Sequence, residues 1–158
     1  MPKRTTLDWL LEFISMAVLA AIFVNLAAHW PELPSRAPHH YGFRGNPNRW
    51  GSKNWMLVLP AIAAGTYILL TAASRYPGLI HLPDSVDRET PEAQQTLLSL
   101  SLVLKLTSLL TLGYINWAGI NIALGRAQGL GPIFLPIVLL GTLGPIIFYT
   151  KKLQRYRA

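Results

Sequence analysis

The chain alternates between four long apolar blocks and shorter polar segments. Each block is roughly 20 residues long, the length that an α-helix needs to cross the ~30 Å hydrocarbon core of a bilayer. The apolar residues collect in these blocks and do not recur with the periodicity of a soluble protein. We therefore predict an all-α integral membrane protein with four transmembrane helices, at residues 7–28, 55–73, 98–124 and 132–150.

The longest polar segment, residues 29–54, lies between the first two predicted helices. Prolines fix the backbone at four points in it, glycines permit positive φ at three, and several aromatic rings suit the membrane–water boundary. This composition predicts a folded cap over the helix ends and not a flexible spacer. Asn46-Pro47-Asn48 reads as a turn within it.

The second polar segment, residues 74–97, is a predicted cytoplasmic loop that ends in a helix start. Thr90 has the side chain of an N-cap, Pro91 suits the first helical position, and Glu92 lies near the positive end of the helix dipole. No internal repeat divides the chain, so we predict one membrane domain spanning residues 1–158.

The formal net charge is +7, from 14 basic and 7 acidic residues. The basic residues flank the apolar blocks, as orientation in a membrane requires, and they form no basic amphipathic helix that would bind nucleic acid. Placing both termini in the cytoplasm leaves eight basic residues inside and five outside, which favours that topology and turns the 29–54 loop outward. The inner set is Lys3, Arg4, Arg75, Arg88, Lys151, Lys152, Arg155 and Arg157, and the outer set is Arg36, Arg44, Arg49, Lys53 and Arg126.

Several polar residues fall inside the predicted spans. Glu12 and Lys105 lie at similar depths, roughly 5–8 Å in from the same face, so an interhelical ion pair is possible. The alternative is that Lys105 extends alone to the interface. Asn25, Asn116 and Asn121 lie toward the outer half of their spans, where we expect hydrogen bonds between helices.

Three histidines and one carboxylate gather around the loop: His29, Glu32, His39 and His40. These are ligand types that zinc and copper accept, and neutral-pH titration of the histidines is a further possibility. Their spacing fits no closed ligand pattern, however. The favoured alternative is that His29 caps the first helix while His39 and His40 make hydrogen bonds within the loop.

The chain contains no cysteine and none of the common nucleophile, metalloprotease, P-loop or dinucleotide-binding motifs. We therefore expect a protein that is not an enzyme and that has no cofactor.

The loop resembles a known family. Its matching residues are Leu33, Pro34, Pro38, His40, Gly45, Trp50, Gly51 and Lys53, and Tyr76-Pro77 follows the same pattern. They are similar to domain of unknown function 1648, a domain of bacterial membrane proteins that also forms the N-terminal part of SdpI-like immunity proteins. The chain departs from the pattern at Gly42 and Asn48, where the family often has Asn and Asp.

This resemblance implies a multi-pass protein of the bacterial inner membrane with the loop outside. It further implies immunity to a secreted toxin, or signalling through a cytoplasmic repressor. We predict a binding, immunity or signalling protein that contacts the lipid bilayer and a protein or peptide partner. The alternatives are a structural subunit of a homo-oligomer or larger membrane complex, and a metal-dependent or transport function at the histidines.

Overall fold

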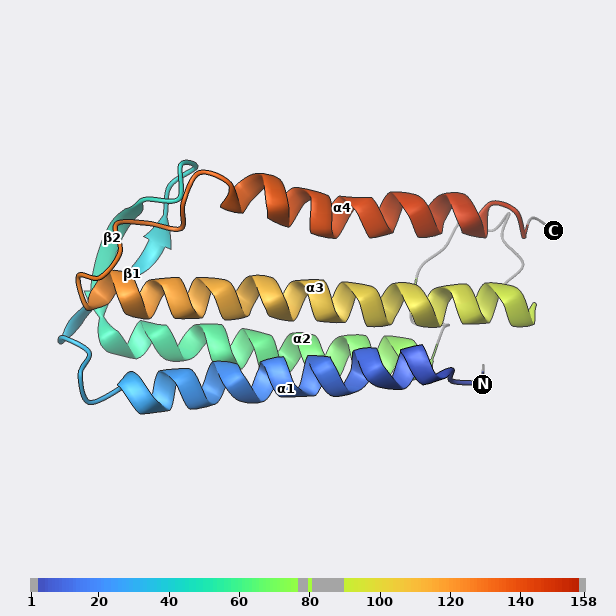
Figure 1. The fold of residues 1–158 in the computed structure, drawn as a ribbon, viewed down its shortest axis with the longest axis horizontal. Coiled ribbons are helices and arrows are strands. Elements are labelled where there is room, and N and C mark those ends of the chain that lie inside the picture. Colours follow the sequence, from blue (N-terminus) through green and yellow to red (C-terminus); the bar gives the residue numbers. More distant parts are fainter. Residues whose placement is uncertain (1–2, 77–79, 81–89, 157–158) are drawn as a thin grey trace.

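The computed structural model describes residues 3–76, 80 and 90–156. Four helices run along its long axis (Figure 1): α1 (Thr6–His29), α2 (Val58–Arg75), α3 (Pro91–Ala123) and α4 (Phe134–Leu153). Between α1 and α2 lie the strands β1 (Arg36–Tyr41) and β2 (Pro47–Ser52) and the 3-10 helix η1 (Lys53–Leu57). All four helices, with η1 joined to α2, are long and apolar enough to cross a membrane, which confirms the predicted fold class.

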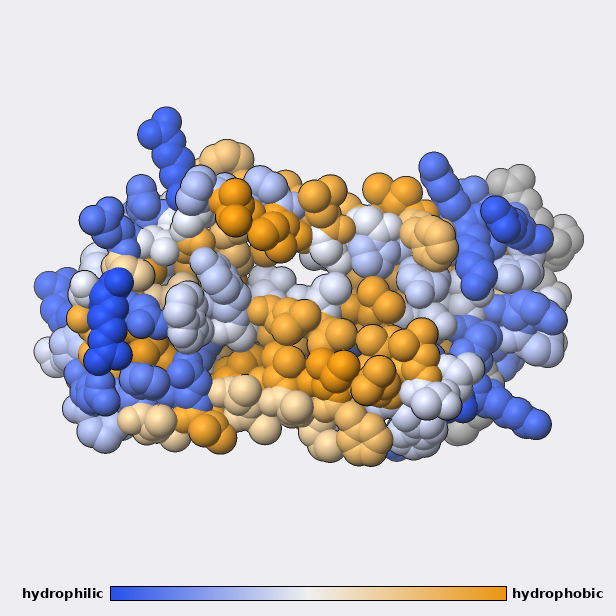
Figure 2. Space-filling model, in the orientation of Figure 1, coloured by the Kyte–Doolittle hydropathy of each residue, from blue (hydrophilic) through white to orange (hydrophobic). Residues whose placement is uncertain are grey.

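The bundle has two distinct ends in Figure 1. The hairpin end carries β1, β2 and the linker between α3 and α4, and the terminal end carries both termini. Residues 77–79 and 81–89, which make up much of the predicted second loop, lie outside the described residues, as do Arg88, Arg157 and Pro77 of the motif. The surface in Figure 2 is apolar over the middle of the helices and polar at both ends, the pattern that a bilayer imposes.

Local sequence explains where the helices begin. The hydroxyl of Thr5 accepts a hydrogen bond from the Asp8 amide, and the Asp8 carboxylate accepts one from the Thr5 amide, so the acid that interrupts the first apolar block closes a capping box. Thr90 caps α3 as predicted, accepting from the Ala93 amide with Pro91 in the first turn. The helix α3 therefore extends well beyond the predicted span of 98–124 toward the terminal end.

Three of the helices form a tight unit and the fourth is set apart. Ile22, Ala63 and Leu109 meet in a buried cluster between α1, α2 and α3. The helix α4 packs mainly against α3, and Leu153 in its last turn is its one buried residue. Because every span is apolar all round, hydrophobic periodicity gave no means of predicting this three-plus-one arrangement.

The predicted cap is an antiparallel β-hairpin. Its turn is closed by the Gly42 amide donating to the Asn46 carbonyl at 2.9 Å, and Gly45 in the turn has φ of +78°. The predicted Asn46-Pro47-Asn48 turn is therefore wrong in position, because Pro47 already begins β2. The chain reverses before it, at residues 43–45, where Gly45 adopts the left-handed backbone that glycine tolerates.

Candidate functional site

The hairpin is irregular at its histidines. Pro38 pairs with Trp50 and His40 with Arg49, and a bulge between Pro38 and His40 leaves His39 outside the regular register. The His39 ring stacks on Trp55 with the ring centroids 5.6 Å apart. His40 reaches the other way along the strand, with its Nδ1 at 2.6 Å from the Asn48 Oδ1.

The root of the hairpin is fixed to the helices by a hydrophobic core of Leu26, Leu33, Ala37, Met56 and Ile120. Burying a leucine, isoleucine or methionine side chain contributes about 1.5–3 kcal/mol. The hairpin is thus seated on α1 and α3 and is not free to swing away from them.

Lys53 adds a polar anchor to this root. Its Nζ donates to the Trp30 carbonyl at 3.3 Å and lies 4.8 Å from the centre of the Trp30 ring. Trp30 is the C-cap of α1, so the ammonium also meets the negative end of the helix dipole. Lys53 therefore holds the return of the hairpin to the end of α1.

Two glycines allow close approaches to the hairpin. A Cβ at Gly119 of α3 would lie 3.0 Å from the Tyr41 hydroxyl, and one at Gly129 of the linker would lie 2.8 Å from the Gly45 carbonyl oxygen. The Leu130 amide donates to that same Gly45 carbonyl at 2.9 Å. Hairpin, α3 and linker thus form one assembly.

Tyr41 projects from β1 toward α3. Burial raises the pKa of its hydroxyl to about 12, because the phenolate would lose water contacts that nothing here replaces. The hydroxyl therefore keeps its proton at neutral pH and remains a hydrogen-bond donor.

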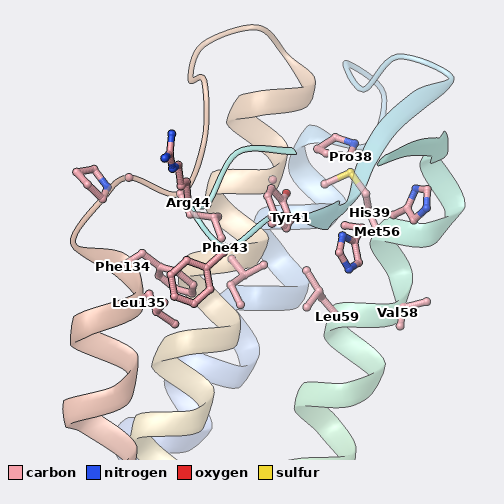
Figure 3. A pocket seen from close by; sticks show the side chains of 18 of the residues that line it. Pro38, His39, Tyr41, Phe43, Arg44, Met56, Val58, Leu59, Phe134 and Leu135 are labelled. Atoms are coloured by element: carbon pink, nitrogen blue, oxygen red, sulfur yellow. The ribbon is translucent and has the colours of Figure 1, made fainter. Parts of the chain in front are cut away.

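A cavity of about 1080 Å³, here called the hairpin cavity, lies beneath the hairpin and is mainly apolar (Figure 3). In the close-up, side chains from α4 and α2 face each other across it. Of the lining residues that the structure describes, Arg44 is the one with a permanent charge, and His39 and His40 lie with it. The apolar walls include Met56, Leu59, Ile62, Ile115, Phe134, Leu135 and Leu139. Its volume reaches the upper end of the range for small-molecule sites, about 300–1,000 Å³.

The motif residues divide between the hairpin root and this cavity. Leu33 and Lys53 secure the root, while Pro38, His40 and Gly45 line the cavity. A Cβ at Gly51 would lie 3.0 Å from the His39 ring, so this glycine makes room for the stack on Trp55. Pro34 and Trp50 are exposed. Most of the motif is therefore accounted for by the hairpin fold and by the cavity that the hairpin covers.

The family comparison matches this region. Residues 16–64 fit the family model described as "Domain of unknown function (DUF1648)". Residues 16–64 are a DUF1648 domain. The matched region runs from the middle of α1 through the hairpin into α2. It therefore includes the cavity-lining residues of β1, of the hairpin turn and of η1.

The chain is also similar to a known archaeal protein. An uncharacterised protein of Archaeoglobus fulgidus is 32% identical over 78 residues, which cover 44% of this chain and 43% of that protein. The chain thus spans less than half the length of this curated relative. No solved structure matches the chain.

The predicted metal ligands do not converge. His29 bonds the Asn25 carbonyl in the last turn of α1, at 2.9 Å, and Glu32 pairs with Arg126 at 3.1 Å. His39 and His40 have the separate partners described above. Within the described residues, no group of three or more His, Cys, Asp or Glu side chains could hold a metal ion.

A charged cluster lies near the terminal end, outside the DUF1648 domain. The Lys105 Nζ is 2.8 Å and 2.9 Å from the two Glu12 carboxylate oxygens and 2.9 Å from the Thr71 hydroxyl. The Tyr67 hydroxyl donates to the same carboxylate at 2.9 Å, and Arg4 approaches it at 3.3 Å. The side chain of Lys105 is 0% exposed, so of the two alternatives that the sequence left open the structure has the ion pair and not the interfacial extension of Lys105.

Sequence reasoning missed the uncharged members of this charged cluster. Tyr67 and Thr71 are four residues apart on α2, a spacing that puts both on one helix face. A polar i, i+4 pair inside an otherwise apolar span was the available signal. Through this pair, Tyr67 and Thr71, α2 is hydrogen-bonded to the ion pair between α1 and α3.

The intramembrane asparagines are only partly as predicted. The Asn25 amide donates to the Asn116 Oδ1 at 3.4 Å, a long hydrogen bond between α1 and α3. Asn116 is fully buried, and its Nδ2 has no partner among the described residues. The interhelical prediction is wrong for Asn121, whose amide bonds the Trp117 carbonyl one turn back along the exposed surface of α3.

Proposed function

We propose that this protein is a non-catalytic binding protein that receives an apolar ligand from the membrane in the hairpin cavity. The observation that carries the proposal is the cavity itself: about 1080 Å³, walled by apolar side chains of three helices and covered by the DUF1648 hairpin. A large apolar pocket with few polar groups is the usual form of a binding site for a hydrophobic molecule.

In the proposed orientation the hairpin faces outward from a plasma membrane and both termini are cytoplasmic. The excess of basic residues predicted at the terminal end, eight against five, supports this orientation. Immunity or signalling, which the likeness to SdpI-like proteins implies, would then be a use of the site: capture of a hydrophobic toxin or signal arriving from outside.

The test is photolabelling of the full chain in nanodiscs with a phosphatidylcholine that carries a diazirine in its acyl chain. We expect labelled peptides to concentrate at the cavity walls of α2 and α4. Leu59→Trp, which fills the cavity, should lower this labelling several-fold. The matched control Ile68→Trp adds the same ring to the exposed face of α2, at a position 67% exposed, and should leave it unchanged.

Labelling spread evenly over the lipid-facing helices, or equal labelling of the two tryptophan variants, would overturn the binding proposal. Loss of folding in Leu59→Trp is recognised by its thermal unfolding, and the smaller filling change Leu59→Phe then replaces it.

The exposed position of α4 favours a second candidate, a subunit of a larger membrane assembly. Large apolar residues such as Leu140, which is 74% exposed, cover this helix, and α4 contacts the bundle mainly along α3. Native mass spectrometry in mild detergent tests this: a fixed multiple of the chain mass supports assembly, and a lone monomer contradicts it.

A further inference from the structure

We infer that the ligand of the hairpin cavity is an acidic phospholipid, with its acyl chains among α2, α3 and α4 and its phosphate at Arg44. This inference rests on the proposed binding function and names the chemistry of its ligand.

The charge of the cavity rim points to an anion. Among the described residues that line the cavity there is no carboxylate, and Arg44 is the only one with a permanent charge. Arginine presents several N–H donors in a planar fork that matches the oxygens of a phosphate. An apolar cavity with this rim therefore complements a molecule that has a long hydrocarbon part and an anionic head.

Arg44 also has its donors free, unlike three other basic residues near the hairpin. Lys53 bonds the Trp30 carbonyl, Arg126 pairs with Glu32, and Arg36 bonds the Trp50 carbonyl at 3.4 Å. Arg44 makes no hydrogen bond or ion pair with any other residue that the structure describes. In Figure 3 its guanidinium extends away from the helices. The Arg49 side chain likewise has no partner among the described residues, but it lies outside the cavity lining.

From the turn downward, the other lining residues match the order of chemical groups along a phospholipid. Below the turn, Tyr41 offers a protonated hydroxyl that has no hydrogen-bond partner among the described residues. This hydroxyl is a suitable donor to an ester carbonyl, the group that lies just below the phosphate. Farther down, Leu135 and Leu139 mark one turn of α4, about 6 Å of apolar wall parallel to the acyl chains.

The experiment compares two photoreactive lipids with identical diazirine acyl chains, a phosphatidylglycerol and a phosphatidylcholine, each at the same low fraction in nanodiscs of unlabelled phosphatidylcholine. We expect the anionic probe to label the cavity peptides about fivefold more than the zwitterionic probe, the size of effect of one solvent-accessible ion pair. Arg44→Gln should reduce this preference to near one.

Two variants control for general effects. Arg49→Gln removes the same charge from an exposed position of β2 outside the cavity lining and should keep the preference. Arg44→Lys retains the charge and should retain most of the preference for the anionic lipid. This variant separates loss of charge from disturbance of the turn.

The outcomes distinguish the inference from the function on which it rests. Equal cavity labelling by both lipids, or a preference that survives Arg44→Gln, would overturn the acidic phospholipid while leaving the binding function standing. Absence of cavity labelling by either lipid would overturn both.

Discussion

The Glu12 carboxylate of α1 lies among cations and hydroxyls supplied by α2, α3 and the N-terminal segment. Lys105 uses all three of its ammonium donors there, two on Glu12 and one on Thr71. Removing two charges from water is costly, and the attraction between them offsets that cost only when the geometry and the hydrogen bonding are good. The pair is therefore expected to be sensitive to loss of either member.

Lys105→Met should lower the free energy of unfolding by about 3 kcal/mol or more, because it leaves the Glu12 carboxylate without its nearest cation. The double variant Glu12→Gln, Lys105→Met should be much less destabilised than the sum of the two single changes. Unfolding in detergent measures both. Additive single effects would contradict the coupling.

The exposed pair Glu32–Arg126 provides the control for this cycle. Its side chains are 53% and 54% exposed, and surface pairs of this kind contribute about 0–1 kcal/mol. Glu32→Gln should therefore barely change the unfolding free energy.

Tyr41 gives the hairpin a dependence on alkaline pH. Its pKa is raised from 10.0 to about 12 in the folded protein, so the folded state holds the proton more tightly than the unfolded state. The stability from this group is complete below pH 10 and is lost as the pH rises from about 10 to about 12. Unfolding measured across this range should show a loss that Tyr41→Phe removes. An identical pH profile in Tyr41→Phe would contradict the assignment to this hydroxyl.

At the scale of elements, the seating of the hairpin depends on glycine at position 119. A Cβ there would lie 3.0 Å from the Tyr41 hydroxyl, closer than ordinary van der Waals contact. Gly119→Ala should therefore shift β1 from α3 and speed hydrogen exchange of the hairpin amides several-fold. Tyr41→Phe, which removes the oxygen, should restore much of the protection in the double variant.

Gly65→Ala is the matched control on α2, since nothing lies within 4 Å of its added Cβ. Alanine is the better helix former by up to about 1 kcal/mol, so this change should leave the hairpin amides as they were. Equal acceleration of exchange in both variants would show that the Tyr41 contact is not the cause.

The elements differ in how far the sequence predicts them. The helices could be predicted from the lengths of the apolar blocks alone, because a bilayer sets the number of apolar residues in a span. The strands did not, because Pro38, the adjacent histidines and the glycines interrupt any apolar–polar alternation, and the bulge at His39 breaks the pleat. Proline and glycine content was sufficient to predict a folded cap but not its hydrogen-bond pattern.

The sequence predicted some residues of the candidate site but not the shape of the cavity. The motif around His40 and Lys53 marked the correct loop, yet one wall of the cavity comes from α4, whose position beside α3 has no signature in the sequence. Counting residues along the spans placed Glu12 and Lys105 at similar depths, so that an ion pair between them was possible. It gave no information on how each helix is rotated, and that rotation decides whether Lys105 pairs or reaches the interface.

At the scale of the whole molecule, the remaining issue is which end faces outward. The hairpin and the C-terminal tail lie at opposite ends, so two labels decide the orientation. Since the chain has no cysteine, Phe43→Cys in the turn and Gln154→Cys after α4 each create a single reactive thiol. Phe43 is 89% exposed and Gln154 is also exposed.

With a membrane-impermeant maleimide on intact cells, the cysteine at position 43 should react at once. The cysteine at position 154 should react only after permeabilisation. This result is expected because the larger number of basic residues resists translocation and keeps the terminal end in the cytoplasm. The reverse pattern would place the hairpin cavity at the cytoplasmic leaflet. An acidic phospholipid could still bind there, but a toxin or signal from outside could no longer reach Arg44 directly.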